Sequence, residues 1–113
     1  VWRKIDECVH DYRRCYDLFL TQHEQMSVLK YEDGAEYKAH WDAGGPEDRA
    51  RTLSMVSYFN DDYIGGELEF CNFDKKIKPS AGSVVLFPSS YPYKHIAYPV
   101  TSGIKYALVT WFS

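Results

Sequence analysis

The stretch Tyr37-Lys38-Ala39-His40-Trp41-Asp42 decides how the rest of the sequence is interpreted. It is typical of an extended strand, in which side chains alternate between the two faces with a period of two. His40 and Asp42 would therefore project from one face and Trp41 from the other. An imidazole and a carboxylate on one face are two thirds of the facial triad that holds Fe(II) and leaves coordination positions open. Because His-x-Asp is also common by chance, the alternative is a surface histidine beside a solvated aspartate.

Length, composition and charge limit the class of protein. The 113 residues suit a single domain, which we place over residues 1–113. The hydrophobic fraction of 45% is enough for a core and too high for a disordered chain. The net charge of -3 comes without a block of lysine or arginine, so nucleic acid is not an expected partner. There is no apolar run long enough to cross a bilayer and no signal peptide pattern, so no membrane association is expected.

Three cysteines, Cys8, Cys15 and Cys71, bear on the redox environment. Their number is odd and none forms a C-x-x-C pair, so neither a disulfide framework nor a zinc site is predicted. We expect reduced, mostly buried thiols, which favours a cytoplasmic location without establishing it. The sequence does not indicate an oligomeric state.

The first part of the chain predicts one amphipathic helix, from residue 2 to about residue 22. Ile5, Val9, Tyr12, Tyr16 and Phe19 recur at three- and four-residue steps, which places them on one helical face. That face would pack on a sheet, so the expected role of the helix is structural.

Residues 27–112 predict a body of about eight short strands. Each expected strand is bounded by turn-forming residues such as Gly, Pro, Asn or Asp. The expected strands cover 27–31, 37–42, 52–60, 67–70, 75–78, 83–87, 93–98 and 104–112. Such spacing favours a sandwich or jelly roll over repeated βαβ units. The predicted fold class is therefore mainly β with one N-terminal helix, an α+β arrangement whose body is a jelly roll.

A second histidine of interest, His95, lies in the expected strand 93–98, far along the chain from His40. Two ligands from one strand and a third from a distant strand suit a jelly roll, which brings separate segments together at its open end. Lys105 follows His95 by ten residues and begins an apolar strand. A lysine in a buried strand is costly without a partner, and a dicarboxylate bound beside the metal would supply one. The alternative is a lysine that snorkels at a strand end.

The combination of His40-x-Asp42, His95 and Lys105 resembles the Fe(II)/2-oxoglutarate-dependent oxygenases, and within them the prolyl 4-hydroxylase type. The resemblance extends from about residue 31 to residue 112. Its further segments are Tyr31-x-x-Gly34-x-x-Tyr37, residues 51–60, Gly65-Gly66-Glu67-Leu68-Glu69-Phe70 and Pro79-x-x-Gly82-x-x-Val85-x-Phe87. The resemblance implies a double-stranded β-helix, a form of jelly roll, with the metal at one open end.

The resemblance also implies a role for each matching residue. His40, Asp42 and His95 would be the iron ligands of the catalytic centre. Lys105 would pair with the distal carboxylate of 2-oxoglutarate, and the hydroxyl of Tyr58 would help to hold the same carboxylate. The cofactors implied are therefore Fe(II), 2-oxoglutarate as cosubstrate and O2, with ascorbate as a candidate reductant.

Two more residues and one loop are placed by the resemblance at the pocket and its mouth. Tyr31 would line the cosubstrate pocket, and Arg51 would face a peptide substrate. The alternative for Tyr31, as for Tyr58, is a cross-strand aromatic of the core, and for Arg51 an exposed side chain after a polar loop. The Gly- and Pro-containing loop 43–50 is the expected lid.

The reaction implied by the resemblance is hydroxylation of a substrate carbon, with release of succinate and CO2. The expected substrate is a prolyl residue in a peptide or protein. Other readings stay open. The substrate could instead be a non-prolyl residue or a small metabolite; the chain could be a cupin-like metal-binding jelly roll without oxygenase activity; or it could be an interaction module in which the histidines are incidental.

Overall fold

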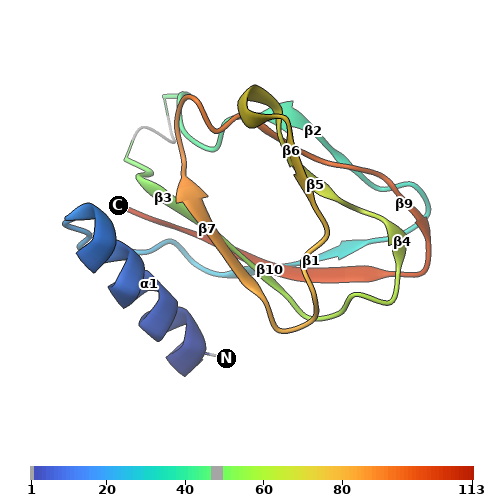
Figure 1. The fold of residues 1–113 in the computed structure, drawn as a ribbon, viewed down its shortest axis with the longest axis horizontal. Helices are drawn as coiled ribbons and strands as arrows, with labels where there is room; N and C mark the ends of the chain where they lie inside the picture. Colours follow the sequence, from blue (N-terminus) through green and yellow to red (C-terminus); the bar gives the residue numbers. More distant parts are fainter. Residues whose placement is uncertain (1, 47–49) are drawn as a thin grey trace.

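The computed structural model describes residues 2–46 and 50–113. Figure 1 shows one helix at the N-terminal end, followed by a body of short strands. In chain order the elements are α1 (Trp2–Tyr16), β1 (Ser27–Tyr31), β2 (Tyr37–His40), β3 (Leu53–Tyr58), β4 (Ile64–Gly65), β5 (Leu68–Phe70), the 3-10 turn η1 (Cys71–Phe73), β6 (Lys75–Ile77), β7 (Val84–Pro88), β8 (His95–Ala97), β9 (Val100–Ser102) and β10 (Lys105–Phe112). The expected class, mainly β with one N-terminal helix, is confirmed. Residues 47–49 of the predicted lid loop lie outside the described residues.

Helix α1 packs part of its predicted apolar face on a sheet (Figure 1). Tyr16 and Phe19, which the pattern also placed on that face, are exposed. The buried residues of the helix are Ile5 and Val9, which lie four residues apart and therefore share one helical face. They pack in one cluster with Leu53 and Met55 of β3 and with Leu108 of β10. This burial holds the helix in place, because an isolated helix of such length is only marginally stable in water.

The predicted end of the helix near residue 22 is wrong, because α1 ends at Tyr16. Asp17 adopts a left-handed backbone conformation with φ 53°, and the chain leaves the helix there. The following backbone donors bond to the far end of the chain: the N–H groups of Thr21 and Gln22 donate to the Ser113 carbonyl at 2.8 and 3.1 Å. These distant partners replace the intrahelical hydrogen bonds, and a local periodicity cannot reveal them.

Two antiparallel four-stranded sheets form the body. Their strand orders are β1-β10-β3-β7 and β2-β8-β5-β6, and β4 pairs with β9 in a small third sheet. Side chains of the two large sheets meet in a second core, where Val56 of β3 and Phe87 of β7 pack with Leu68 and Phe70 of β5. Since side chains alternate along β3, the first sheet is covered by α1 on one face and by the second sheet on the other.

One strand that contributes to the site is shorter than the sequence predicts. Strand β2 ends at His40, so Asp42 lies just beyond the strand instead of within it. The Ala43 N–H donates to the Ser89 carbonyl at 2.9 Å, which directs the chain toward the end of β7. Elsewhere the expected strand 93–98 is shortened to β8, and β4 and β9 are additions that the sequence pattern did not predict.

The prediction of mostly buried thiols is wrong. Cys15 is exposed, Cys8 and Cys71 are half-buried, and all three are free. Cys15 falls outside the stripe of α1 that begins at Ile5 and Val9, so it faces solvent. Among the described residues, no helix combines the length and the apolar character needed to span a membrane.

Candidate metal centre

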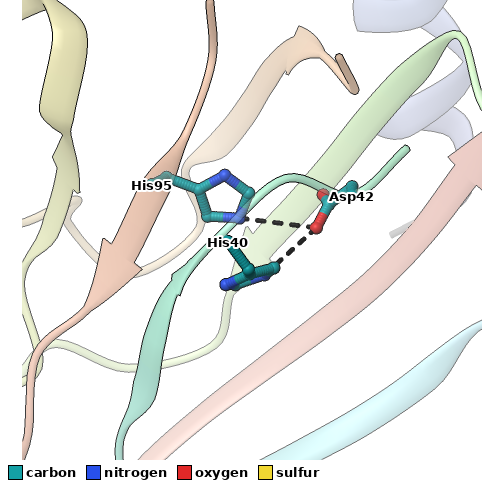
Figure 2. Close-up of side chains that lie close together, drawn as sticks. All are labelled: His40, Asp42 and His95. Atoms are coloured by element: carbon teal, nitrogen blue, oxygen red, sulfur yellow. Dashed lines mark ion pairs between the residues drawn. The ribbon is translucent and has the colours of Figure 1, made fainter. Parts of the chain in front are cut away.

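Three polar side chains from two distant segments of the chain converge beside the second sheet (Figure 2). His40 ends β2, Asp42 follows it, and the antiparallel register places His95 of β8 opposite His40. The Nε2 atom of His40 lies 3.2 Å from Asp42 Oδ1, and the Nε2 atom of His95 lies 3.5 Å from the same oxygen. One ligand atom from each residue lies within 4.8 Å of the others. The structure therefore brings together the three side chains that the sequence proposed as iron ligands.

Each imidazole is oriented by the backbone carbonyl two residues before it. Nδ1 of His40 contacts the Lys38 carbonyl oxygen at 2.6 Å, and Nδ1 of His95 contacts the Tyr93 carbonyl oxygen at 3.0 Å. A carbonyl oxygen can only accept, so Nδ1 carries the proton in both rings. Nε2 of each ring therefore faces Asp42 and is the atom available to a metal, which would take the place of any proton shared with the carboxylate.

The charge states of the three groups suit ligation of a cation. Burial by itself would raise the pKa of Asp42, but hydrogen bonds from His40, Ser54 and Trp111 and the nearby His95 bring it down to about 2. Burial lowers the pKa of His95 and outweighs its attraction to Asp42. Burial also disfavours the charged form of His40, yet the hydrogen bond to Asp42 raises its pKa. An anionic carboxylate therefore faces His95, whose neutral form is favoured by burial, and His40, whose proton the carboxylate helps to hold.

The donor set fits a divalent transition metal. Two imidazole nitrogens and one carboxylate oxygen are the ligands of the facial triad that binds Fe(II) and leaves positions open for other molecules. Asp42 and His95 are buried and His40 is half-buried, so a bound ion would be reached from one side only. Among the described residues, no other group of histidine, cysteine and acidic side chains could hold a metal ion.

A cavity of about 340 Å³ begins at this cluster and reaches the side chain of Lys105. Lys105 is only 2% exposed, and its Nζ donates to the Gly66 carbonyl at 3.0 Å. The described residues supply no carboxylate within ion-pairing distance of this amine, and burial lowers its pKa to about 8. The Glu67 carboxylate attracts the amine from beyond ion-pairing distance and only partly offsets this burial. A buried amine without a paired carboxylate would attract one from a ligand in the cavity.

The two predicted pocket tyrosines also line the cavity. The Lys105 Nζ lies 4.7 Å from the ring centroid of Tyr31 and 5.3 Å from that of Tyr58, which stabilises the ammonium form. Burial raises the pKa of Tyr31 to about 12 and raises that of Tyr58 further above its usual value. Both phenols therefore stay protonated and can donate to an anionic ligand.

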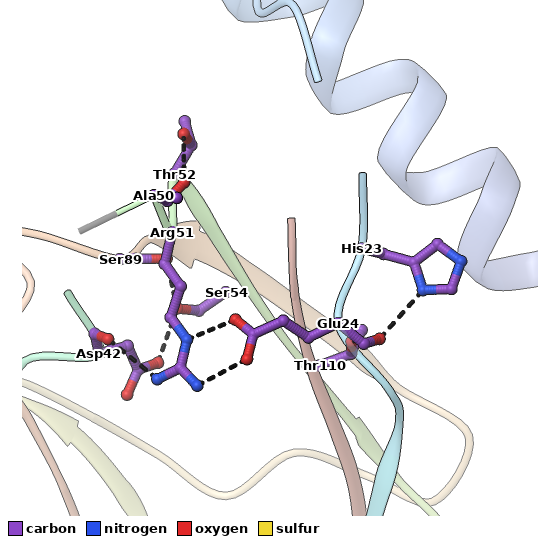
Figure 3. A network of polar contacts seen from close by, with 9 residues as sticks. All are labelled: His23, Glu24, Asp42, Ala50, Arg51, Thr52, Ser54, Ser89 and Thr110. Atoms are coloured by element: carbon purple, nitrogen blue, oxygen red, sulfur yellow. Dashed lines mark hydrogen bonds and ion pairs between the residues drawn. The ribbon is translucent and has the colours of Figure 1, made fainter. Parts of the chain in front are cut away.

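Arg51, expected to face a peptide substrate, lines the same cavity and belongs to the network of polar contacts that Figure 3 shows. Its guanidinium donates to both carboxylate oxygens of Glu24, at 2.5 and 2.8 Å, and to the Asp42 carbonyl at 3.2 Å. It also stacks over the Trp111 ring at 3.8 Å from the centroid. Arg51 thus connects the segment before β1 to the metal-ligand segment, and its contact with a substrate stays a prediction.

Sequence reasoning missed three residues that support Asp42, either directly or through another side chain. Ser54 donates to Asp42 Oδ2 at 2.6 Å, Ser89 contacts Ser54, and the Trp111 side chain hydrogen-bonds Asp42. The only signal for Ser54 was a polar residue inside the apolar run of β3. Trp111 lies in an apolar strand and would be taken for a core residue. No local pattern identifies Ser89 as part of the site, because its partner is distant in sequence.

Comparison with known proteins identifies a family. The model of the 2OG-Fe(II) oxygenase superfamily matches residues 26–113. A probable prolyl 4-hydroxylase of Arabidopsis thaliana is 30% identical over 115 residues, covering 78% of this chain and 40% of that protein. A PKHD-type hydroxylase of Synechococcus sp. is 36% identical over 89 residues, covering 72% and 39%. The chain thus spans less than half the length of either relative.

A solved structure agrees with these matches. The crystal structure of a Pseudomonas putida prolyl-4-hydroxylase superposes with a TM-score of 0.77 at 28% sequence identity, covering 96% of this chain and 62% of that one. The family match includes all three residues of the metal cluster as well as Lys105. On these grounds the chain belongs to the 2OG-Fe(II) oxygenase superfamily and is similar within it to the prolyl 4-hydroxylases.

Proposed function

We propose that this chain is a single domain, residues 1–113, that uses Fe(II), 2-oxoglutarate and O2 to hydroxylate a carbon of its substrate, with release of succinate and CO2. One observation carries the proposal: a facial set of two imidazoles and a carboxylate shares a cavity with a buried amine that has no ion-paired carboxylate among the described residues. A site that only bound a metal would have no use for the buried amine. A buried amine without a ligand to pair with would destabilise the folded protein. We also propose that the two four-stranded sheets form a double-stranded β-helix, which the likeness to the prolyl hydroxylase structure supports.

The proposed roles follow from the contacts described above. His40, Asp42 and His95 would hold the iron, which with its cosubstrate and O2 supplies the oxidising chemistry. Lys105 would pair with the distal carboxylate of 2-oxoglutarate, and the added negative charge would favour its ammonium form. Tyr58 and Tyr31, which lie next to Lys105 and stay protonated, would direct their hydroxyls toward the same carboxylate.

The proposed substrate is a prolyl residue in a peptide or protein. Prolyl 4-hydroxylases among the relatives support this choice, and so does the aromatic character of the cavity edge. Tyr37 and Trp41 are about half exposed and line the cavity beside the metal cluster. Flat aromatic surfaces suit the ring of proline, and Arg51 beside them could bind a peptide carbonyl.

The test is turnover of a proline-rich peptide with Fe(II), 2-oxoglutarate, air and ascorbate as reductant. Succinate would be measured by NMR, and the peptide would be examined by mass spectrometry for one added oxygen on proline. The proposal expects both, in equal amounts, and neither with His40→Ala. Succinate without peptide oxidation would indicate a non-prolyl residue or a small metabolite as substrate. Metal binding without succinate would refute the oxygenase assignment and favour a binding jelly roll.

A further inference from the structure

Two buried serines lie behind the metal cluster, on the side of Asp42 that faces away from the imidazoles. Ser54 is 1% exposed and Ser89 is 0% exposed. Ser54 Oγ lies 2.6 Å from Asp42 Oδ2 and 2.8 Å from Ser89 Oγ. We infer that Ser54 and Ser89 are positioning residues, a two-hydroxyl relay that holds the Asp42 carboxylate so that only Oδ1 is presented to the metal. The inference rests on the proposed iron site.

The direction of both hydrogen bonds follows from the chemistry of the groups. An ionised carboxylate accepts only, so the single hydroxyl proton of Ser54 is donated to Asp42. Ser54 must then be the acceptor in its contact with Ser89, and Ser89 the donor. The shorter distance, to Asp42, is typical of a hydroxyl bonded to an anion, and the longer one is typical of two neutral hydroxyls. The relay therefore has one polarity and ends on Asp42.

The relay is attached to a rigid part of the fold. Ser54 lies in β3, whose pairing with β7 places Ser54 opposite Phe87. Ser89 follows β7; its N–H donates to the Thr52 carbonyl at 3.0 Å, and its own carbonyl accepts from the Ala43 N–H at 2.9 Å. Asp42 has left strand β2 and has no sheet of its own to orient it. The two serines therefore supply support to Oδ2 that the strand does not, alongside the contacts of Trp111 and Arg51 with Asp42.

The consequence is that the carboxylate ligates through one oxygen. Oδ1 lies between the two Nε2 atoms, whereas Oδ2 is engaged by a buried hydroxyl that cannot turn toward solvent. If Oδ2 were free, a small rotation would allow both oxygens to bind and would occupy a further position on the metal. Outer partners of this kind commonly change metal affinity by about 10–100-fold when they are removed.

The chain offers a matched control. Ser57 lies three residues after Ser54 on the same strand and is also buried. Because strand side chains alternate, Ser57 projects from the opposite face and does not reach Asp42. Ser57→Ala therefore makes the same chemical change in the same strand without touching the relay.

The experiment measures Mn²⁺ affinity, with Mn²⁺ as a redox-stable probe whose free ion is counted by EPR. The variants are Ser54→Ala, Ser89→Ala, the double variant, Ser57→Ala and Ser54→Thr, each checked for folding by circular dichroism. We expect Ser54→Ala to weaken binding by about 10–100-fold and Ser89→Ala to weaken it less. The double variant should equal Ser54→Ala, because Ser89 acts through Ser54. Ser57→Ala should bind as the wild type does, and Ser54→Thr, which keeps the hydroxyl, should retain the affinity.

Several results would overturn the inference. Wild-type affinity in Ser54→Ala would do so, as would an equal loss in Ser57→Ala, which would make the effect one of general packing. Additive losses in the double variant would show that Ser89 acts by another route. If Ser54→Ala does not fold, the test depends on Ser89→Ala. An unchanged Mn²⁺ affinity in that variant would refute the relay. Failure of the wild-type chain itself to bind Mn²⁺ would instead refute the proposed function, and the relay would fall with it.

Discussion

Replacing Lys105 with methionine should make the ligand-free protein more stable at neutral pH while weakening its affinity for 2-oxoglutarate. The side chain is 2% exposed, and burial lowers its pKa from 10.5 to about 8. A change of this size corresponds to a cost on the order of 3 kcal/mol for carrying the charge in the folded state. Methionine is similar in length and apolar, so it removes that cost without opening a large cavity.

The pH dependence identifies the source of the gain. Because the pKa of Lys105 is lower in the folded protein than in the unfolded chain, the unfolded chain binds the proton more tightly and is favoured. This penalty is complete below pH 8 and disappears as the pH rises to 10.5. The stability advantage of Lys105→Met should therefore shrink by on the order of 3 kcal/mol across that interval. At the alkaline end, loss of the hydrogen bond to Gly66 should leave the variant slightly less stable, by about 1 kcal/mol.

Urea unfolding of both proteins between about pH 7 and pH 10 measures this difference, and other titrating groups cancel in the comparison. Lys76→Met is the matched control, because Lys76 is exposed on β6 and outside the cavity. Its stability difference from the wild type should not vary with pH in this way. A Lys105→Met advantage that is absent at neutral pH, or constant across the range, would refute the idea that the amine is held charged at a cost.

The same variant should bind 2-oxoglutarate more weakly. Loss of a charge-assisted contact of roughly 1.5–3 kcal/mol corresponds to roughly 10–150-fold in dissociation constant. Isothermal titration of the Mn²⁺-loaded proteins checks this, with Lys76→Met expected to match the wild type. An unchanged affinity in Lys105→Met would remove this residue from the cosubstrate site.

The remaining predictions concern the metal, the mouth and the core. His40→Ala should abolish Mn²⁺ binding by EPR while circular dichroism shows a folded protein; retained binding would contradict the ligand set. Because the ligating imidazole nitrogens must be deprotonated, Mn²⁺ should be released on acidification as protons displace it from His40 and His95, and a pH-independent affinity would contradict ligation by histidine. Arg51→Lys should raise the KM for a peptide substrate more than it lowers kcat, since lysine cannot bind Glu24 with two parallel bonds or stack on Trp111 as arginine does; an unchanged KM would argue against a role at the mouth. Ile5→Ala, at a fully buried position, should lower the free energy of unfolding by about 2–5 kcal/mol in urea, and a negligible loss would show that α1 contributes little to the fold.

Much of the architecture was readable from local pattern. The three- and four-residue spacing around Ile5 and Val9 predicted the buried face of α1, and the turn-bounded apolar runs predicted most of the strands. Periodicity reports which face of an element is buried, so it succeeds wherever burial is decided by neighbours in the chain. It failed at the end of α1, where the hydrogen-bond partner is Ser113, at the other end of the molecule.

The same distinction between local pattern and distant contacts applies to the candidate site. The sequence by itself determined the chemical types: His40, Asp42 and His95 as a donor set, with Lys105 as a positive charge ten residues after His95. Only the tertiary structure decided that these groups share one cavity. It also decided that Oδ2 of Asp42 accepts a hydrogen bond from Ser54, which in turn contacts Ser89. The physical reason is that a hydrogen bond is specified by distance and direction in space, whereas Ser54 and Ser89 are separated by 35 residues of chain and meet only because β3 pairs with β7.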